Sequence, residues 1–218
     1  MNQVKNFSLF LLALFLLGSC TPQKKTHLPV SRSTELKEAV FAGGCFWCME
    51  APFEKLKGVK EVISGFSGGT LKNPSYAQVA SGQTKHVESV LVQYDPNEIS
   101  YNQLLDIFWK QIDPTDSNGQ FVDRGPQYRP VIFYQTEDEK KLALKSKQKL
   151  AMNPTFIKKV DHKPITTEIL PFQSFYPAQG KDSYHQDYYK NHSVKYWYYR
   201  GRSGRDSFLD HVWGKDRH

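Results

Sequence analysis

The most reactive residue types in the sequence are two cysteines separated by two residues. Cys45 and Cys48 follow a pair of glycines, and the aromatic residues Phe46 and Trp47 lie between them. Two thiols at this spacing are typical of thiol–disulfide redox chemistry, in which the thiolate is the nucleophile. A helix that begins at the second cysteine would favour the thiolate at both positions, because a helix N-terminus carries partial positive charge. Phe46 and Trp47 would then offer an apolar wall to a substrate with a small hydrophobic group.

The spacing alone leaves three other interpretations of the two cysteines open. They are also compatible with buried packing residues, with half of a zinc site, or with a structural disulfide. The sequence has no second C-x-x-C, no P-loop and no dinucleotide-binding fingerprint. Its scattered histidines, His86, His162, His185 and His192, show no ligand spacing. We therefore predict that the protein needs no metal, nucleotide or flavin.

The segments around the cysteines are predicted to mix strands and helices. An apolar run at 39–42 predicts a strand that ends at the glycine pair. Pro52 predicts a helix that begins near Cys48, since proline is tolerated in the first turn of a helix. Ser100 is a suitable N-cap for a helix at 101–112. The other predicted elements are strands at 59–66, 87–94, 131–134 and 165–170, a helix at 137–152, and long, often functional loops at 113–130 and 171–186. This mixture favours an α+β fold, a two-layer sandwich in which helices cover one side of a mixed sheet.

Length and composition limit the class of protein. The 218 residues include 39% hydrophobic and 14% aromatic residues, enough for the core of one domain with an extension. Three cysteines exclude a disulfide-rich scaffold, and a single short apolar run excludes a polytopic membrane protein. The formal net charge is +7, but the lysines and arginines are scattered rather than gathered in one stripe. We therefore predict no nucleic-acid partner.

The N-terminus has the pattern of an export signal. Lys5 precedes an apolar run at 7–17, which is shorter than the roughly 20 residues of an ordinary membrane-spanning helix. The string Leu17-Gly18-Ser19-Cys20 resembles the bacterial lipoprotein signal, which implies cleavage before Cys20 and lipid attachment to its sulfur. The expected organisation is a signal peptide at 1–19, a flexible lipid-anchored tether at 20–35 and a folded domain at 36–218. We expect an exported protein of the bacterial cell envelope, anchored to a membrane by its lipid.

Several short motifs resemble those of one enzyme family. Residues 44–50 (GCFWCME) resemble the signature of peptide methionine sulfoxide reductase A. The other matching motifs are 64–69 (SGFSGG), 73–76 (NPSY), 86–88 (HVE), 108–116 (FWKQIDPTD), 123–129 (DRGPQYR) and 184–188 (YHQDY). Together they cover about residues 38–200. The resemblance implies the family's ferredoxin-like fold and the repair of oxidised methionine.

The resemblance also implies roles for named residues. Cys45 takes the position of the nucleophile that attacks the sulfoxide sulfur. Phe46 and Trp47 take the position of the pocket wall that receives the S-methyl group. The remaining positions surround the sulfoxide oxygen or lie beside the pocket: Glu88, Tyr76 and Tyr128 as hydrogen-bonding groups, Asp123 as a lining residue and His185 as a neighbour of the site.

These residue types suit the reduction of a sulfoxide. The oxygen leaves as water only when it is protonated, and burial raises the pKa of a glutamate such as Glu88 so that it keeps its proton. Tyrosine hydroxyls donate to the negative charge that develops on the oxygen. Attack by Cys45 yields methionine and a sulfenic acid, with which Cys48 condenses to a disulfide that a thioredoxin-like reductant then reduces. Direct reduction of the sulfenic acid by an external thiol is the alternative, since no cysteine follows Cys48.

Two other functions fit part of the pattern. A general thiol–disulfide oxidoreductase needs both cysteines but has no use for Glu88 and the two tyrosines. A non-catalytic binding lipoprotein would use the aromatic pocket alone. We predict instead a monomeric enzyme without a cofactor, which reduces the S-epimer of methionine sulfoxide in oxidised proteins, in peptides and as the free amino acid.

Overall fold

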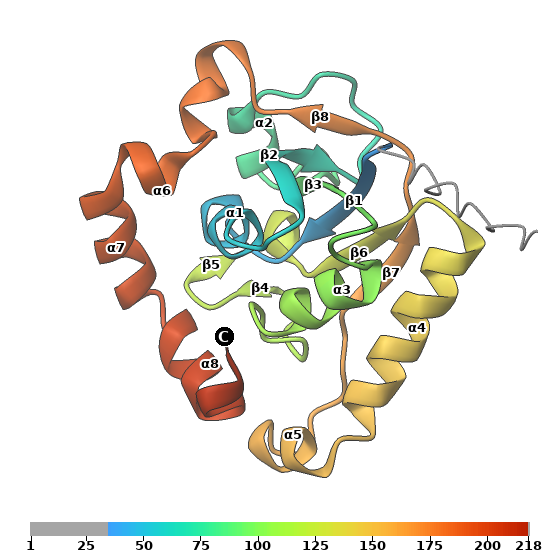
Figure 1. Ribbon diagram of the computed structural model, residues 1–218. Coiled ribbons are helices and arrows are strands. Elements are labelled where there is room, and N and C mark those ends of the chain that lie inside the picture. The colour runs from blue at the N-terminus through green and yellow to red at the C-terminus, as the bar shows by residue number, and fades with distance from the viewer. Residues whose placement is uncertain (1–34, 218) are drawn as a thin grey trace, which may run out of the picture. The chain divides into compact units, whose positions relative to one another are not determined.

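The computed structural model describes residues 35–217 (Figure 1). The predicted signal peptide, Cys20 and all but the last residue of the predicted tether lie outside this range. No helix within the range combines the length and the hydrophobicity of a transmembrane segment. The strands are β1 (Lys37–Ala42), β2 (Val59–Ser67), β3 (Val87–Tyr94), β4 (Gly119–Gln120), β5 (Asp123–Arg124), β6 (Val131–Tyr134), β7 (Glu168–Pro171) and β8 (Phe175–Pro177). The α-helices are α1 (Phe46–Glu54), α2 (Tyr76–Ala80), α3 (Tyr101–Trp109), α4 (Glu137–Ala151), α5 (Pro154–Lys159), α6 (Tyr188–Asn191), α7 (Ser193–Arg202) and α8 (Arg205–Trp213), and the short 3-10 helices are η1 (Pro126–Tyr128), η2 (Gly180–His185) and η3 (Gly214–Arg217).

Six of the strands form one mixed sheet, in the order β7-β6-β1-β3-β2-β8. All neighbouring strands are antiparallel except β6 and β7. The path β1-α1-β2-β3-α3-β6 places four strands in the order β6-β1-β3-β2, which is the βαββαβ arrangement of ferredoxin-like folds. Strands β4 and β5 form a separate two-stranded ribbon. The predicted α+β fold, with helices packed on a mixed sheet, is confirmed (Figure 1).

Each face of the sheet carries its own apolar layer. In β1, Ala39 and Phe41 belong to the main core, which also includes residues of α1, α3 and α4, whereas Val40 and Ala42 belong to a smaller cluster. The two sets alternate because successive side chains of a strand point to opposite faces of the sheet. Phe175 of β8 packs against the smaller cluster. Burial on both faces explains why the β1 segment is a continuous apolar run.

Most predicted boundaries agree with the structure to within a few residues. Strands β3 and β6 match their predicted ranges, and α3 begins after Ser100, whose side chain forms a capping box with Gln103. Strand β7 begins at 168 rather than at 165. The backbone N–H groups of Thr166 and Thr167 instead donate to the carbonyl oxygen of Pro114, at 2.8 and 3.2 Å. These two residues therefore satisfy their hydrogen bonds outside the sheet.

Helix α1 begins earlier than the sequence predicts. It starts at Phe46, with Cys45 as its N-cap, so Pro52 lies inside the helix rather than in its first turn. A proline here cannot donate to the carbonyl four residues back, which belongs to Cys48. Arg200 of α7 supplies the missing donor, since its Nη1 lies 3.3 Å from the Cys48 carbonyl oxygen. The interior proline is tolerated because a distant helix completes the hydrogen bonding.

The C-terminal segment forms three helices that the sequence analysis does not predict. No side chain of α6 or α7 is fully buried, so neither helix shows a clear apolar periodicity. Figure 1 shows α6, α7 and α8 following one another along one flank of the molecule, and α6 contacts α1. Through this flank the C-terminal segment reaches the helix that carries the two cysteines.

Candidate active site

The two cysteines lie at the start of α1, Cys45 as the N-cap and Cys48 in the first turn. The thiol of Cys45 donates a hydrogen bond to the sulfur of Cys48. The backbone N–H of Cys48 donates to the carbonyl oxygen of Cys45 at 3.0 Å. Both cysteines are free, Cys48 is fully buried, and Cys45 is 6% exposed. The spacing therefore places two reduced thiols side by side at the beginning of a helix.

The two thiols differ in acidity. Burial raises the pKa of Cys45 well above its ordinary value. The hydrogen bond from Cys45, helped by the guanidinium groups of Arg205 and Arg200, lowers the pKa of Cys48 to about 6. The expectation of a thiolate at both positions is therefore wrong. The pair holds one proton and one negative charge near neutral pH, and the charge rests on Cys48 because the cations act on that sulfur.

Cys45 borders a cavity of about 180 Å³. The lining residues are Cys45, Phe46, Trp47, Tyr76, Glu88, Asp123, Tyr128 and Tyr199. They come from α1, α2, β3, β5, η1 and α7, which are far apart in the sequence. All of them except Tyr199 are residues that the sequence analysis places at the site. The low exposure of Cys45 is compatible with chemistry, because the residue faces this cavity rather than packing against protein on all sides.

Glu88 lies on β3, on the same face of the sheet as Val90 of the main core. Its Oε2 accepts a hydrogen bond from the backbone N–H of Phe46 at 3.1 Å and so satisfies one of the free N–H groups at the start of α1. The residue is 2% exposed. Burial raises the pKa of Glu88 to about 8; the hydrogen bond from Phe46 opposes this shift, and the charge of Asp123 adds to it. Glu88 therefore holds a proton at neutral pH.

Tyr76 and Tyr128 enter the cavity from two short helical segments. Tyr76 is the first residue of α2, where a capping box of Ser75 and Gln78 fixes the turn. Its backbone N–H also donates to Oδ2 of Asp182 at 2.8 Å. Tyr128 is the last residue of η1. Burial raises the pKa of both hydroxyls, and a hydrogen bond joins the two side chains. Both tyrosines therefore remain protonated donors at neutral pH.

The aromatic wall is held in place by η2 and α6. The indole of Trp47 stacks on the ring of Tyr188 with 3.7 Å between ring centroids, and its Nε1 donates to Nδ1 of His185 at 3.0 Å. Burial lowers the pKa of His185 to about 4, so the imidazole is neutral and Nδ1 accepts. The His185 ring also packs against Phe46 and Tyr76, at centroid distances of 4.9 and 4.2 Å. His185 does not line the cavity; it positions the side chains that do.

Asp123 of β5 and Tyr199 of α7 close another side of the cavity. The Tyr199 hydroxyl donates a hydrogen bond to Oδ2 of Asp123, and its ring meets Trp47 edge-on at 5.8 Å. Burial raises the pKa of both side chains, although the hydrogen bond from Tyr199 and the charge of Arg205 act in the opposite direction on Asp123. The sequence analysis misses Tyr199. The one feature of the sequence that could have indicated Tyr199 is the aromatic run at 196–199 (YWYY), and such a run is equally typical of packing residues.

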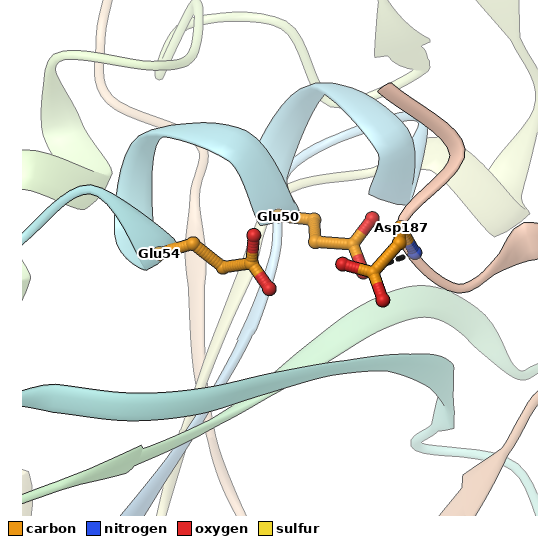
Figure 2. Close-up of side chains that lie close together, drawn as sticks. All are labelled: Glu50, Glu54 and Asp187. Carbon is orange, nitrogen blue, oxygen red and sulfur yellow. Dashed lines mark hydrogen bonds between the residues drawn. The ribbon is translucent and has the colours of Figure 1, made fainter. Parts of the chain in front are cut away.

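Three carboxyl groups gather between α1 and α6. Figure 2 shows Glu50, Glu54 and Asp187, whose carboxyl oxygens lie within 4.8 Å of one another. Glu50 accepts a hydrogen bond from the backbone N–H of Asp187 at 2.9 Å, and burial raises the pKa of Glu50 to about 8. The ammonium group of Lys190 lies 2.7 Å from Glu54 and 2.6 Å from Asp187. The proton on Glu50 and the ammonium group of Lys190 thus offset the negative charge of the three carboxyl groups. The cluster connects α1 to the segment that carries His185.

The arrangement as a whole suits a substrate that has a small apolar group next to a polar oxygen. The aromatic side chains of Phe46 and Trp47 can pack against the apolar group. A protonated Glu88 and the tyrosine hydroxyls can donate to the oxygen, and a cysteine borders the same space. A general thiol–disulfide exchange site would need the cysteines but not a buried neutral acid.

Comparisons with known proteins agree with this chemistry. A family model described as peptide methionine sulfoxide reductase matches residues 37–217. The chain is 48% identical to the peptide methionine sulfoxide reductase MsrA of Halalkalibacterium halodurans over 180 residues, which make up 83% of this chain and 98% of that protein. It is 49% identical to MsrA 2 of Staphylococcus aureus over 176 residues, 81% of this chain and 95% of that protein. The chain is also 45% identical to the MsrA/MsrB protein of Vibrio cholerae over 211 residues. This match covers 97% of the chain but only 53% of the Vibrio cholerae protein.

Two solved structures share the fold. Mxr1 from Saccharomyces cerevisiae in its reduced form has a TM-score of 0.64 and 30% sequence identity, and the match covers 74% of this chain and 88% of that one. Methionine sulfoxide reductase A of Corynebacterium diphtheriae has a TM-score of 0.63 and 27% identity, with 73% of this chain and 76% of that one covered. The similarity thus extends over most of the chain.

Proposed function

The chain belongs to the peptide methionine sulfoxide reductase family and reduces methionine sulfoxide to methionine, and on that basis we propose that Cys45 is the sulfur that attacks the substrate. The observation that carries the proposal is that Cys45 and a protonated Glu88 border one cavity of about 180 Å³. The aromatic side chains of Phe46 and Trp47 pack against the S-methyl group of the substrate. This contact points the sulfoxide sulfur at Cys45 and its oxygen at the acid.

The first chemical step transfers oxygen from the substrate to the enzyme. The Cys45 thiol passes its proton to the Cys48 thiolate, to which it is hydrogen bonded, and attacks the sulfoxide sulfur. Glu88 gives its proton to the oxygen, while Tyr76 and Tyr128 donate hydrogen bonds to the charge that develops there. Methionine is released, and Cys45 is left as a sulfenic acid.

The second step closes a disulfide between Cys45 and Cys48. The two sulfurs are already hydrogen bonded, and among the described residues these are the only cysteines. A thioredoxin-like protein or a dithiol then reduces the disulfide by thiol exchange. If Cys48 is the resolving residue, the Cys48→Ser variant accumulates the Cys45 sulfenic acid after one equivalent of sulfoxide. An intramolecular disulfide in that variant, detected by mass spectrometry, would contradict the assignment.

The substrate we propose is the S-epimer of methionine sulfoxide, in oxidised proteins and peptides and as the free amino acid. The proposal rests on the similarity to MsrA proteins and on the chiral placement of an apolar wall, an acid and a sulfur around the substrate. The test is turnover of the two separated epimers with dithiothreitol, for the wild type beside Cys45→Ser. We expect turnover of one epimer alone and none in the variant. Equal turnover of both epimers would overturn the assignment.

We also propose that the enzyme is an exported lipoprotein, anchored through Cys20 by the tether at 20–35 and working as a monomer. The support is the sequence pattern at 1–20, which lies outside the described residues. Growth of an expressing bacterium with radiolabelled palmitate tests the anchor. Label that is lost in Cys20→Ala supports it, and an unlabelled protein in the soluble fraction contradicts it.

A further inference from the structure

Arg205 is a buried cation that forms no direct ion pair with a carboxylate among the described residues. It is 1% exposed and is the largest fully buried side chain among residues 35–217. Within that range its guanidinium group forms no ion pair with an aspartate or glutamate, and its Nε has no hydrogen-bond partner. A buried charge is costly unless an opposite charge lies near it. Asp123 interacts with the charge of Arg205 without a direct ion pair. Arg205 therefore lacks a directly paired anion among residues 35–217.

The contacts of Arg205 fix it beside the turn that carries the cysteines. Its Nη2 donates to the carbonyl oxygen of Gly43 at 3.0 Å, and its Nη1 donates to the carbonyl oxygen of Gln111. A Cβ at Gly44 would lie 2.8 Å from Nη2 of Arg205, and Gly44 has a φ of +85°. The ring of Phe121 lies on the guanidinium group, 4.7 Å from its central carbon to the ring centroid. Arg205 is thus held rigidly against the residues that precede Cys45.

A second guanidinium group approaches the same place from α7. The Nη1 of Arg200 donates to the Cys48 carbonyl oxygen at 3.3 Å, which Pro52 leaves free. Arg200 differs from Arg205 in that it already has a carboxylate partner, Asp206, at 3.0 Å. Of the two arginines, Arg205 is therefore the one without a directly paired carboxylate among the described residues.

We propose that Arg205 is the counter-ion of the Cys45–Cys48 pair, and that it holds the negative charge on Cys48, the thiolate that closes the disulfide. This inference rests on the proposed function. It makes Arg205 a positioning residue, because its charge acts on the reaction through the sulfur of Cys48. The two guanidinium groups also contribute to the lowered pKa of Cys48, which supports the assignment.

The step that Arg205 promotes is balanced without a further reactant. The Cys48 thiolate attacks the sulfur of the Cys45 sulfenic acid, the S–S bond forms and the S–O bond breaks. The Cys48 sulfur is oxidised and the Cys45 sulfur is reduced. Before this attack, Cys48 gives up the proton that it took from Cys45, and the Glu88 carboxylate that protonated the sulfoxide takes up a proton again, as their pKa values of about 6 and about 8 favour. Hydroxide then leaves and takes the proton of Glu88, or one from solvent, to become water. In the resting enzyme the same charge prepares Cys48 to accept the Cys45 proton before attack on the sulfoxide.

The groups that interact electrostatically with Cys48 come from α1, two strands and the two C-terminal helices α7 and α8. They are Cys45 at the start of α1, Glu88 of β3, Asp123 of β5, Tyr196, Tyr199 and Arg200 of α7, and Arg205 of α8. The two carboxyl groups in this set have raised pKa values, and the tyrosines are protonated at neutral pH. The arginines are therefore the groups in this set that favour a thiolate through their charge.

The first experiment measures the ionisation of Cys48 directly. In the full chain with Cys45→Ser, thiolate absorbance at 240 nm is titrated between pH 4 and 10, and the same titration of Cys45→Ser/Cys48→Ser is subtracted to remove every other group. We expect Arg205→Met to raise the midpoint by at least one pH unit, which is about a tenfold loss of thiolate at a given pH below the midpoint. Arg205→Lys, which keeps the charge, is expected to recover part of the shift.

The second experiment separates the two chemical steps in a single turnover with one equivalent of peptide methionine sulfoxide. Released methionine reports the first step, and the Cys45–Cys48 disulfide, found by quenching and mass spectrometry, reports the second. In Arg205→Met we expect the rate of disulfide formation at pH 6.5 to fall about threefold or more, and the deficit to shrink as the pH rises and Cys48 ionises without help. The matched control is Arg202→Met, which removes an exposed arginine from α7 that stacks on Tyr198.

The outcomes are distinct. Two results would overturn the role of Arg205 while leaving the enzyme a reductase. One is an unchanged midpoint of the Cys48 titration in Arg205→Met; the other is a loss in the rate of disulfide formation that is equally large at every pH. A wild type that releases no methionine, or releases it without forming the disulfide, would instead overturn the proposed mechanism. Circular dichroism checks that each variant folds. If Arg205→Met does not fold, Arg205→Gln, which removes the charge but keeps a hydrogen-bond donor, replaces it in both experiments. An unchanged pKa of Cys48 in that variant overturns the role of Arg205.

Discussion

The two sides of the cavity are equally buried but hold opposite charge states. On the oxygen side, burial raises the pKa of Glu88 to about 8, and no cation is among the groups that shift it, so the acid stays neutral. On the sulfur side, the hydrogen bond from Cys45, with the charges of Arg205 and Arg200, lowers the pKa of Cys48 to about 6, so this thiol is ionised. Burial by itself disfavours the charged form in both places. The hydrogen bond between the two cysteines and the placement of Arg205 and Arg200, rather than exposure to water, therefore decide where charge resides in this site.

The largest effect should come from removing the proton on the oxygen side. Glu88→Gln keeps an oxygen that can accept the hydrogen bond from Phe46 but loses the acidic proton. We expect kcat/KM for a peptide sulfoxide to fall by about 10²–10⁴, the usual contribution of a general acid. Steady-state kinetics with dithiothreitol measures this loss.

The pH profile provides the control for the Glu88 substitution. Because Glu88 acts in its protonated form, kcat/KM of the wild type is expected to fall as the pH rises through about 8. Glu88→Gln should lack this fall, since its side chain does not titrate in this range. A wild-type profile that stays flat up to pH 9.5 would show that the acid is not Glu88, and the contrast between the two sides of the cavity would be lost.

A smaller loss is expected from the hydroxyl donors on the same side. Tyr128→Phe removes one donor to the sulfoxide oxygen and keeps the ring that lines the cavity. We expect kcat to fall about 100-fold, as for loss of one donor from an oxyanion site, with KM little changed. Tyr134→Phe is a suitable control, because Tyr134 ends β6 and is not among the lining residues. A loss confined to KM would mean that Tyr128 binds the substrate rather than stabilising charge.

The residues that the family resemblance assigns to the oxygen side do line one cavity, and short local motifs carry that resemblance. Alternation along 87–94 puts Glu88 on the same face as Val90, and that face proves to be the one that α1 covers. The short motifs around Tyr76 and Tyr128 are compact enough to be recognised as units. Neither inference needs knowledge of a residue more than a few positions away.

The sulfur side is hidden from sequence reasoning because distant residues determine it. The rule that places proline in the first turn gives the wrong start for α1, since the donor that compensates Pro52 is on Arg200, far along the chain. Arg205 is also unexpected, because an arginine is almost always exposed unless it is paired. A single sequence shows neither the burial of that arginine nor its contact with the Gly43 carbonyl.

The same contrast predicts an effect on stability. Between its ordinary pKa of 4.5 and the raised value of about 8, Glu88 holds a proton in the folded protein that the unfolded chain has lost. The free energy of unfolding therefore decreases as the pH rises through this window. Glu88→Gln removes this dependence. The variant should therefore be more stable than the wild type at pH 8, by on the order of 4 kcal/mol, and the gain should vanish near pH 4.5. Urea denaturation of both proteins at both pH values measures the difference. Burial also raises the pKa of Glu50 to about 8, but Glu50 is present in both proteins, so its contribution to the pH dependence cancels.

The smallest effect concerns the aromatic wall, which belongs to neither charged side. His185→Phe keeps a ring against Phe46 and Tyr76 but removes the acceptor for the Trp47 indole N–H. One hydrogen bond contributes about 0.5–1.5 kcal/mol, so we expect KM to rise about 2–12-fold with kcat and the pH midpoint unchanged. His211→Phe, an exposed substitution on α8, is the matched control. Because burial lowers the pKa of His185 to about 4, the imidazole is neutral at higher pH. A shifted midpoint of the pH–rate profile in His185→Phe would therefore show that the histidine titrates together with the groups of the oxygen side.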